Sequence, residues 1–483
     1  MFDIEELTIK KFHNALLSGK ITCEEVTKLY LDRINKYDKQ NAKLNSIILI
    51  NENAINEAKT LDLYFKNNNK LIGELHGVCI LLKDNCETYD MPTTAGSLSL
   101  KSFNTKKDAF IVQKLRKAGA IIIAKSNLHE FAIWGETVSS ILGQTYNPYD
   151  HTRTPGGSSG GTGAGIAANF ALVGIGTDTI NSVRSPSSAC SLCGIRPSIG
   201  LVSRDGIIPY SLTQDTVGPI ARTVEDATKV LNVIVGYDKN DESTFEEKEK
   251  THDYTKNLIK GYLQGKRIGI LKSFMGSKEE HKEVNNCMIN CFNILKEQGA
   301  ILVDIEEKIS SSHLVKDISL HLYDFKSDLY NYLIKYESPI HSLDDLLKSK
   351  KYTKDIEENV IYANKIEINS KEYKDRLEKR AELKKEILNL FDKYNIDAII
   401  YPHQQQLVCK VGFQQEERNG AIASITGFPA IVVQAGFSSQ SDDAPLGVPI
   451  GLEIMGKPFC EGEIISIAYS FEDCTHFRKK PIM

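Results

Sequence analysis

The sequence lacks any hydrophobic run long enough to cross a membrane. Its longest apolar stretches, such as AIIIA at 120–124 and DAIIY at 397–401, are far shorter than the roughly 20 residues that a membrane-spanning helix needs. It also lacks an excess of positive charge, because 59 Lys and Arg stand against 63 Asp and Glu. No overall field therefore draws the protein onto phosphate backbones or anionic lipid. We expect neither a membrane nor a nucleic acid as its partner.

The amino-terminal segment MFDIEELTIKKF lacks the basic patch and the uninterrupted apolar segment of a secretory signal. Ten cysteines are scattered over 483 residues, a usage that a reducing compartment tolerates. We therefore expect a cytoplasmic protein. The close pair Cys190 and Cys193 has CxxC spacing, but no second pair of cysteines or histidines follows at ligand spacing. We interpret both thiols as buried small apolar groups and predict no metal site.

The composition is that of a soluble globular protein with a sizeable core, with 41% hydrophobic and 25% charged residues. Apolar residues at steps of three and four predict helices over 5–70. From Leu75, short apolar runs alternate with a helical pattern, which indicates an α/β core. A mainly helical layer over 277–394 is followed by further strands, so we expect one interleaved domain. The charged segment 238–255 is interpreted as an exposed connection, and a division into two lobes at this segment is left open.

A glycine-rich loop, PGGSSGGTGAG, covers Pro155–Gly165. It contains no lysine, as a phosphate-binding P-loop would require. The segment before it, YDHTRTPGGSS, does not have the strand pattern that must precede a dinucleotide-binding turn. These two absences argue against a nucleotide, and we predict no cofactor. Serines in such a loop suit acyl transfer instead, because a freely bending backbone presents a hydroxyl and free amides at one point.

Acyl transfer by a serine needs a base, and the usual signals for a histidine base are missing. There is no G-x-S-x-G elbow, and His76, His129, His151 and His403 have the pattern of ordinary loop or element-end residues. A lysine can replace histidine where burial lowers its pKa enough to keep the amine neutral. Lys83 ends the apolar run VCILL and precedes the turn-like Asp84-Asn85. It is therefore the candidate base.

Three ordered segments carry a resemblance to a known family: GVCILLKDN, PGGSSGG and GIGTDTINSVRSPSSACSLCGIRP. Together they resemble the signature of the amidase signature hydrolases, which are serine amidases. Further matches from about residue 70 to 475 include TTAGS, AKSNLHEF, QDTVGPIARTVEDA, SITGFPAIVV, PIGLEIMG and AYSFE. The resemblance implies a single α/β/α domain over 71–483, with a central mixed sheet flanked by helices, after a helical lead-in over 1–70.

The resemblance also assigns a Ser-cis-Ser-Lys triad. Ser182 is the implied nucleophile, Ser158 the serine that passes its proton, and Lys83 the final base. The implied oxyanion hole consists of the backbone amides of Thr179, Ile180, Asn181 and Ser182. Ile180-Asn181 replaces the family's usual pair of glycines, and a β-branched residue tolerates positive φ poorly. Either the loop keeps negative φ at position 180, or the geometry of the hole differs. Asp178 and Arg184 are interpreted as structural residues that hold this loop.

The substrate pocket is weakly specified by the sequence. Phe131 and Trp134 are candidates for an acyl pocket, and Gln404 and Gln405 for polar contacts, with core packing as the alternative. The expected function is hydrolysis of a small carboxylic amide to acid and ammonia or amine through an acyl-enzyme on Ser182. Two alternatives stay open: the A subunit of a tRNA-dependent amidotransferase, which works with charged tRNA and a B subunit, and a catalytically silent docking module. A homodimer is also left open.

Overall fold

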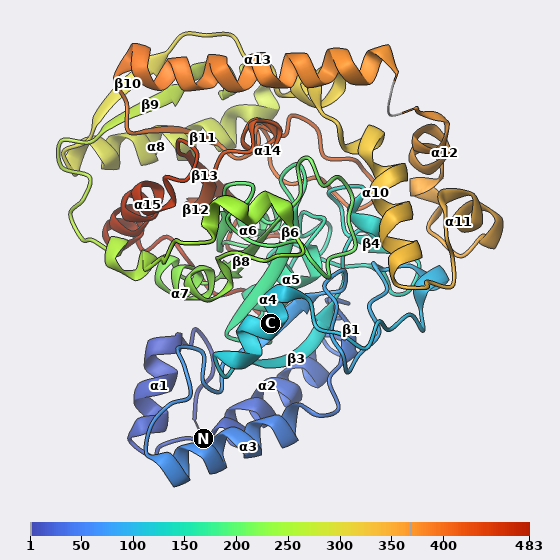
Figure 1. Ribbon diagram of the computed structural model, residues 1–483. Helices are drawn as coiled ribbons and strands as arrows, with labels where there is room; N and C mark the ends of the chain where they lie inside the picture. Colours follow the sequence, from blue (N-terminus) through green and yellow to red (C-terminus); the bar gives the residue numbers. More distant parts are fainter. Residues whose placement is uncertain (1, 368–369) are drawn as a thin grey trace.

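A computed structural model describes residues 2–367 and 370–483 (Figure 1). Within these residues, one mixed 11-stranded sheet has the order β1-β3-β2-β6-β8-β7-β12-β13-β11-β9-β10. In that order, the strands are β1 (Ile47–Ile50), β3 (Ile121–Ser126), β2 (Cys79–Lys83), β6 (Val173–Asp178), β8 (Thr216–Ala221), β7 (Cys193–Arg196), β12 (Ala430–Phe437), β13 (Pro449–Met455), β11 (Ala398–Pro402), β9 (Arg267–Leu271) and β10 (Ile301–Ile305). The short strands β4 (Val138–Ser139) and β5 (Gly143–Gln144) pair separately.

Helices cover the sheet, as the sequence predicts (Figure 1). They are α1 (Ile9–Leu17), α2 (Cys23–Tyr37), α3 (Ala54–Asn68), α4 (Phe110–Lys117), α5 (Gly160–Ala167), α6 (Arg184–Ala189), α7 (Val224–Ile234), α8 (Lys282–Glu297), α9 (Ser311–His313), α10 (His321–Lys335), α11 (Leu343–Ser349), α12 (Glu357–Lys365), α13 (Lys371–Tyr394), α14 (Ala421–Thr426) and α15 (Glu461–Thr475). Strands such as β2, β3 and β6 are buried throughout, because helices and loops cover both faces of the sheet. No described helix is both long enough and apolar enough to span a bilayer.

The amino-terminal 70 residues are not purely helical, which corrects the sequence prediction. Between α2 and α3 the run IILI forms β1, which pairs antiparallel with β3 at one edge of the sheet. The buried Asp38 carboxylate fixes the start of this strand, because it accepts hydrogen bonds from the amides of Ser46 and Ile47. A four-residue apolar run is too short for its period to distinguish strand from helix, so the pattern missed it.

Segment 238–255 does not separate two lobes, a division that the sequence left open. The sheet continues across both halves of the chain, since β9 and β10 follow this segment and join β11 in the same sheet. Several polar residues of the segment are themselves buried. Asp241 pairs with Arg204 at 2.6 Å, and Thr244 bonds to the backbone oxygens of Asp238 and Asp241. Paired charges can be buried, so hydrophilic composition alone does not show which residues are exposed.

The predicted helical layer at 277–394 is present, but it consists of two separate parts. Helix α8 packs on the sheet beside β10, and α13 runs along the same end of the molecule (Figure 1). Helices α10, α11 and α12 form a group of their own. The apolar side chains of this group form a separate buried cluster, which also includes Phe131 and Tyr210.

Candidate active site

Lys83 lies at the carboxyl end of β2 and is completely buried. Its Nζ is 2.8 Å from Ser158 Oγ and 2.7 Å from Thr177 Oγ1. The contact with Thr177 follows from the sheet, because β2 and β6 pair in parallel with Leu82 opposite Ile175. Asn85, just after β2, donates to the same Thr177 hydroxyl at 3.1 Å. The sheet register thus holds the amine against the glycine loop.

Burial gives Lys83 an unusual protonation equilibrium. Loss of solvation lowers the pKa of its ammonium group to about 7, and the charges of Cys86, Asp178 and Asp215 oppose this only in part. Among the described residues, no carboxylate lies within 4.0 Å of its Nζ. Lys125 is equally buried, but it lies 3.6 Å from Asp84. A large fraction of Lys83 is therefore neutral near pH 7.

The glycine loop places Ser158 beside this amine. The Gly157–Ser158 peptide bond is cis, and the carbonyl oxygen of Ser158 accepts a hydrogen bond from the amide of His129 at 3.0 Å. Helix α5 begins at Gly160 and packs closely against its surroundings. A methyl group at Gly161 would lie only 2.4 Å from the Asn127 carbonyl oxygen. The loop needs glycine at this position because the backbones approach so closely.

Ser182 lies in the loop between β6 and α6, residues 179–183, and retains 5% exposure. The amide of Ser159 donates to the carbonyl oxygen of Ser182 at 3.2 Å, so the two serine loops are joined through their backbones. In the described chain, no hydrogen bond links the Ser182 hydroxyl to another residue, and no described acceptor takes the backbone N–H groups of residues 179–182. This stretch therefore offers a hydroxyl and free donors at one place.

The Ile180-Asn181 replacement leaves the backbone unstrained. Neither residue adopts positive φ. Of the two possibilities that the sequence left open, the loop thus keeps negative φ at position 180. The Ile180 side chain is buried in an apolar cluster with α13 and α14, which explains why a large residue is tolerated there.

A buried ion-pair network holds the loop that carries Ser182. Asp178 pairs with Arg184 at 3.0 Å and with Arg196 at 2.7 Å, and it accepts from the amide of Val183. These positive groups overcome the effect of burial and hold the pKa of the Asp178 carboxyl well below its ordinary value. Arg184 also pairs with Glu453 from β13. The geometry agrees with a structural role for Asp178 and Arg184.

Comparison with known proteins gives the family. Residues 25–465 match the Amidase family model. The chain belongs to the amidase family. It is 33% identical to the A subunit of glutamyl-tRNA(Gln) amidotransferase from Thermoanaerobacter pseudethanolicus, over 99% of this chain and 98% of that protein. It is 34% identical to a probable amidase of Arabidopsis thaliana, over 99% of this chain and 92% of that protein.

Solved amidase structures agree with this assignment. The peptide amidase of Stenotrophomonas maltophilia superposes with a TM-score of 0.89, at 32% identity, over 99% of this chain and 98% of that one. An amidase family protein of Bacillus anthracis gives a TM-score of 0.88 at 31% identity, over 99% of this chain and 93% of that one. The predicted mixed sheet flanked by helices is thereby confirmed, and the protein is an amidase-type enzyme.

The predicted pocket residues of this amidase lie in two different settings. Phe131 is buried against Phe325 of α10, with ring centroids 6.2 Å apart, whereas Trp134 is half-buried and its indole N–H has no partner among the described residues. Gln405 donates to Asn419 Oδ1 at 3.2 Å, and the buried Gln404 Oε1 accepts no hydrogen bond from the described residues. None of the four has a described hydrogen bond to the triad, so their substrate-binding role stays a prediction.

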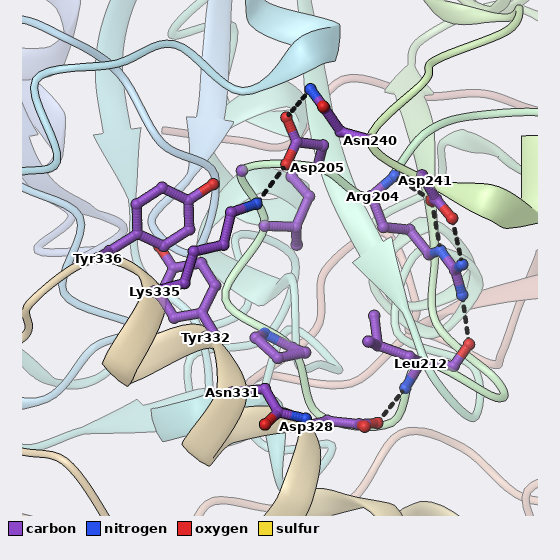
Figure 2. A pocket seen from close by; sticks show the side chains of 13 residues that line it. Arg204, Asp205, Leu212, Asn240, Asp241, Asp328, Asn331, Tyr332, Lys335 and Tyr336 are labelled. Carbon is purple, nitrogen blue, oxygen red and sulfur yellow. Dashed lines mark hydrogen bonds and ion pairs between the residues drawn. The ribbon is translucent and has the colours of Figure 1, made fainter.

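A cavity of about 190 Å³ beside the α10 helix contains none of the triad residues (Figure 2). Its charged side chains already have partners. Asp205 lies 3.0 Å from Lys335, Asp241 binds Arg204, and Asp328 accepts from the amide of Leu212 at 2.7 Å (Figure 2). No serine lines this cavity. The candidate groups for amide chemistry, Lys83 and the two serine loops, therefore lie outside this cavity.

Thr177 is the main residue of the site that sequence analysis missed. It contacts Lys83 through its hydroxyl, and its carbonyl oxygen accepts from Ser159 Oγ at 3.2 Å. The available signal was its position at the end of β6, a strand that the motif GIGTDT marks. Only the register between β2 and β6 shows that this hydroxyl meets the lysine.

Proposed function

We propose that this protein hydrolyses a primary carboxylic amide to the acid and ammonia, with Ser182 as nucleophile. The observation that carries the proposal is the buried amine of Lys83, 2.8 Å from Ser158 Oγ, in a loop bonded directly to that of Ser182. Burying a lysine without a carboxylate partner costs stability and brings no structural benefit. Its presence beside two serines favours catalysis over a silent docking module.

In the proposed acylation, the Ser182 hydroxyl oxygen attacks the amide carbonyl carbon. The Ser182 proton passes to Ser158, while the Ser158 proton passes to the neutral amine of Lys83. The tetrahedral intermediate then collapses, and the relay returns a proton to the departing nitrogen. The C–N bond breaks, ammonia leaves and an ester on Ser182 remains. Water attacks this ester through the same relay and releases the acid.

The free amides of residues 179–182 are the proposed oxyanion hole. Donors that are fixed before the reaction stabilise the charge that develops on the carbonyl oxygen, a contribution of roughly 3 kcal/mol for a single donor. Two observations support this assignment: the amides have no acceptor among the described residues, and the Asp178 network fixes the loop. The hydrogen bond between the Ser158 and Ser182 hydroxyls, which the relay needs, is expected to form on substrate binding, since catalytic hydrogen bonds are often long or absent without substrate.

An ammonia-release screen over primary amides tests this function, with purified wild-type protein beside Ser182→Ala. We expect one or more amides to release ammonia with the wild type and at least about 10³-fold less with the variant. Ser439→Ala removes an exposed serine hydroxyl and is the matched control. Equal ammonia release by wild type and Ser182→Ala would refute the nucleophile.

A second candidate function is that of an amidotransferase component, favoured by the 33% identity with the A subunit of such an enzyme over nearly the whole chain. The two functions differ in what the isolated chain can do. A stand-alone amidase turns over without any other protein, whereas an amidotransferase component is expected to need charged tRNA and its protein partner for full activity. The screen with and without glutamyl-tRNA and a heterologous B subunit separates them. Activity that appears only with both additions would favour the second function.

A further inference from the structure

Arg418 is a half-buried cation without a partner, in the loop between β11 and α14. Within residues 2–367 and 370–483, its guanidinium donates no hydrogen bond, and no carboxylate lies within 4.0 Å of it. Every other arginine in the chain donates at least one hydrogen bond to a side chain or a carbonyl oxygen. Five N–H donors are thus left free in a partly desolvated place.

No acidic side chain of the described residues forms an ion pair with Arg418; Glu416, two residues before it, is exposed to solvent. The adjacent Glu417 pairs with Lys278 at 2.9 Å and with His281 at 2.7 Å. The Glu136 carboxylate accepts from the amides of Gly135 and Gln415. Asp215 accepts from the Thr179 hydroxyl and from two backbone amides. No described carboxylate therefore neutralises Arg418 by direct contact.

Packed glycines connect Arg418 to both serine loops. Its Nη1 lies 3.9 Å from where a methyl group on Gly135 would be. Gly135 is in turn packed against Gly157, which precedes Ser158: a methyl group on Gly157 would lie 2.7 Å from the Gly135 carbonyl carbon. Two residues after Arg418, Gly420 packs against Asn181, which precedes the nucleophile, with 3.1 Å from an added methyl group to Asn181 Cβ.

The charge of Arg418 affects the pKa values of two further side chains, His321 and Tyr210. Burial and the charges of Arg418 and Arg376 lower the pKa of His321 to about 3, so its imidazole is neutral. Tyr210 stacks edge-on against His321 at 5.5 Å; burial raises the pKa of its hydroxyl, and Arg418 partly opposes this. The Tyr210 hydroxyl is buried and has no hydrogen-bond partner among the described residues. The charge of Arg418 thus acts on a buried hydroxyl that has no hydrogen-bond partner among the described residues.

We propose that Arg418 binds a carboxylate on the acyl half of the amide substrate, so that the enzyme prefers monoamides of dicarboxylic acids or their amino derivatives. This inference rests on the proposed amide hydrolysis. A planar guanidinium binds a carboxylate through two parallel hydrogen bonds, which fixes both position and orientation. The carboxylate belongs to the acyl half because a primary amide leaves only ammonia on the other side.

The first experiment compares matched charged and neutral amides. Succinamate and glutaramate are the charged probes; 4-methylpentanamide and 5-methylhexanamide replace the two carboxylate oxygens by methyl groups. For the wild type we expect kcat/KM at least about tenfold higher on the charged amide of one pair. Arg418→Gln should lose about 100-fold on that amide, mostly through KM, and less than about threefold on its neutral partner.

Two further variants sharpen the comparison. Arg418→Lys keeps the charge but loses the paired donors, so we expect it to restore only part of the preference. Lys385→Gln, on an exposed face of α13, removes one positive charge at a distance and should change nothing. A wild type that treats both amides of each pair alike would overturn the inference while leaving the amidase function intact. An equal loss by Arg418→Gln on both amides would do the same.

A binding measurement separates this inference from the proposed chemistry. Trp134 is the single tryptophan and precedes Gly135, the residue that lies against Arg418, so its fluorescence reports on the surroundings of Arg418. We expect succinate or glutarate to quench or shift the emission of Ser182→Ala protein saturably, and the added Arg418→Gln change to abolish the response. Binding that depends on Arg418 would support the inference even if no amide is cleaved. No response, or an unchanged response without Arg418, would overturn it.

Discussion

The amide of Ser159 donates a hydrogen bond to the carbonyl oxygen of Ser182 across 3.2 Å. This bond joins the glycine loop to the loop that follows β6. The two loops are otherwise held in place by different interactions. The glycine loop is held by close backbone approach, and the Ser182 loop by the charges around Asp178. The relative position of the two serines therefore depends on main-chain atoms, which side-chain substitutions leave in place.

Covalent labelling provides a prediction that is independent of the substrate. A fluorophosphonate should modify the wild type at one serine, since it reports on an activated hydroxyl and not on a particular acyl group. Ser182→Ala should remove the label, and mass spectrometry of the wild-type adduct should locate it at Ser182. Unfolding temperature should stay the same, because the hydroxyl makes no hydrogen bond to a described residue. A label that persists on another serine would contradict the assignment.

The pH dependence follows from Lys83. The proposed base is the neutral amine, and burial lowers the pKa of its ammonium form to about 7. Turnover should therefore rise with pH, with unit slope in log kcat/KM below about pH 7 and a plateau above it. Lys83→Arg should remain inactive up to about pH 9, since guanidinium stays protonated. Near-normal activity of Lys83→Arg would show that the residue balances charge and does not take the proton.

Thr177 should act as a positioning residue for that amine. Its hydroxyl accepts from Lys83 at 2.7 Å, which favours the protonated form. In Thr177→Val we expect turnover to fall roughly 10- to 100-fold and the midpoint of the pH profile to move to lower pH, because the ammonium loses an acceptor. Thr177→Ser keeps the hydroxyl and should recover both. An unchanged midpoint in Thr177→Val would limit the residue to packing.

The network at Asp178 should matter for stability. Asp178→Asn would leave the buried guanidinium groups of Arg184 and Arg196 without their shared charge, and breaking such a buried pair typically lowers the free energy of unfolding by about 3–5 kcal/mol. Urea denaturation measures this loss. Asp304→Asn, in an exposed pair with Lys272 at 3.9 Å, is the matched control and should be neutral. Equal stability of both variants would contradict the argument.

Chelation should leave turnover unaffected. In the proposed mechanism Lys83 takes the proton and the free backbone amides stabilise the oxyanion, so both tasks are performed by the protein itself. Dialysis against EDTA followed by the ammonia assay measures the effect, with a dialysed sample without EDTA as reference. Activity that disappears and returns with one particular metal ion would overturn the proposed relay.

The motifs name Lys83, Ser158 and Ser182, and the structure brings Lys83 to Ser158, while the catalytic roles of all three stay predictions. Lys83 and Ser182 lie in the local motifs GVCILLKDN and GIGTDTINSVRSPSSACSLCGIRP, which can be recognised from the sequence alone. Thr177 and Arg418 become informative only through contacts with residues distant in sequence, which depend on strand register and loop packing. The edge strand β1 was missed because four apolar residues fit either period. Segment 238–255 is largely exposed, as its charge predicts, but composition could not single out its buried members such as Asp241 and Thr244.

The grouping of α10, α11 and α12 affects which parts of this enzyme can be substituted independently of one another. His321 and Phe325 come from α10, whereas Lys83, Ser158 and Ser182 all precede residue 183 in the chain. The helical group meets the rest of the site through an apolar cluster around Phe131 and Tyr210. The α10–α12 group contributes none of the three proposed catalytic residues. A library confined to residues 320–365 would therefore vary the surroundings of Phe131 and Tyr210 without changing Lys83, Ser158 or Ser182, which makes this segment a natural unit to exchange between relatives.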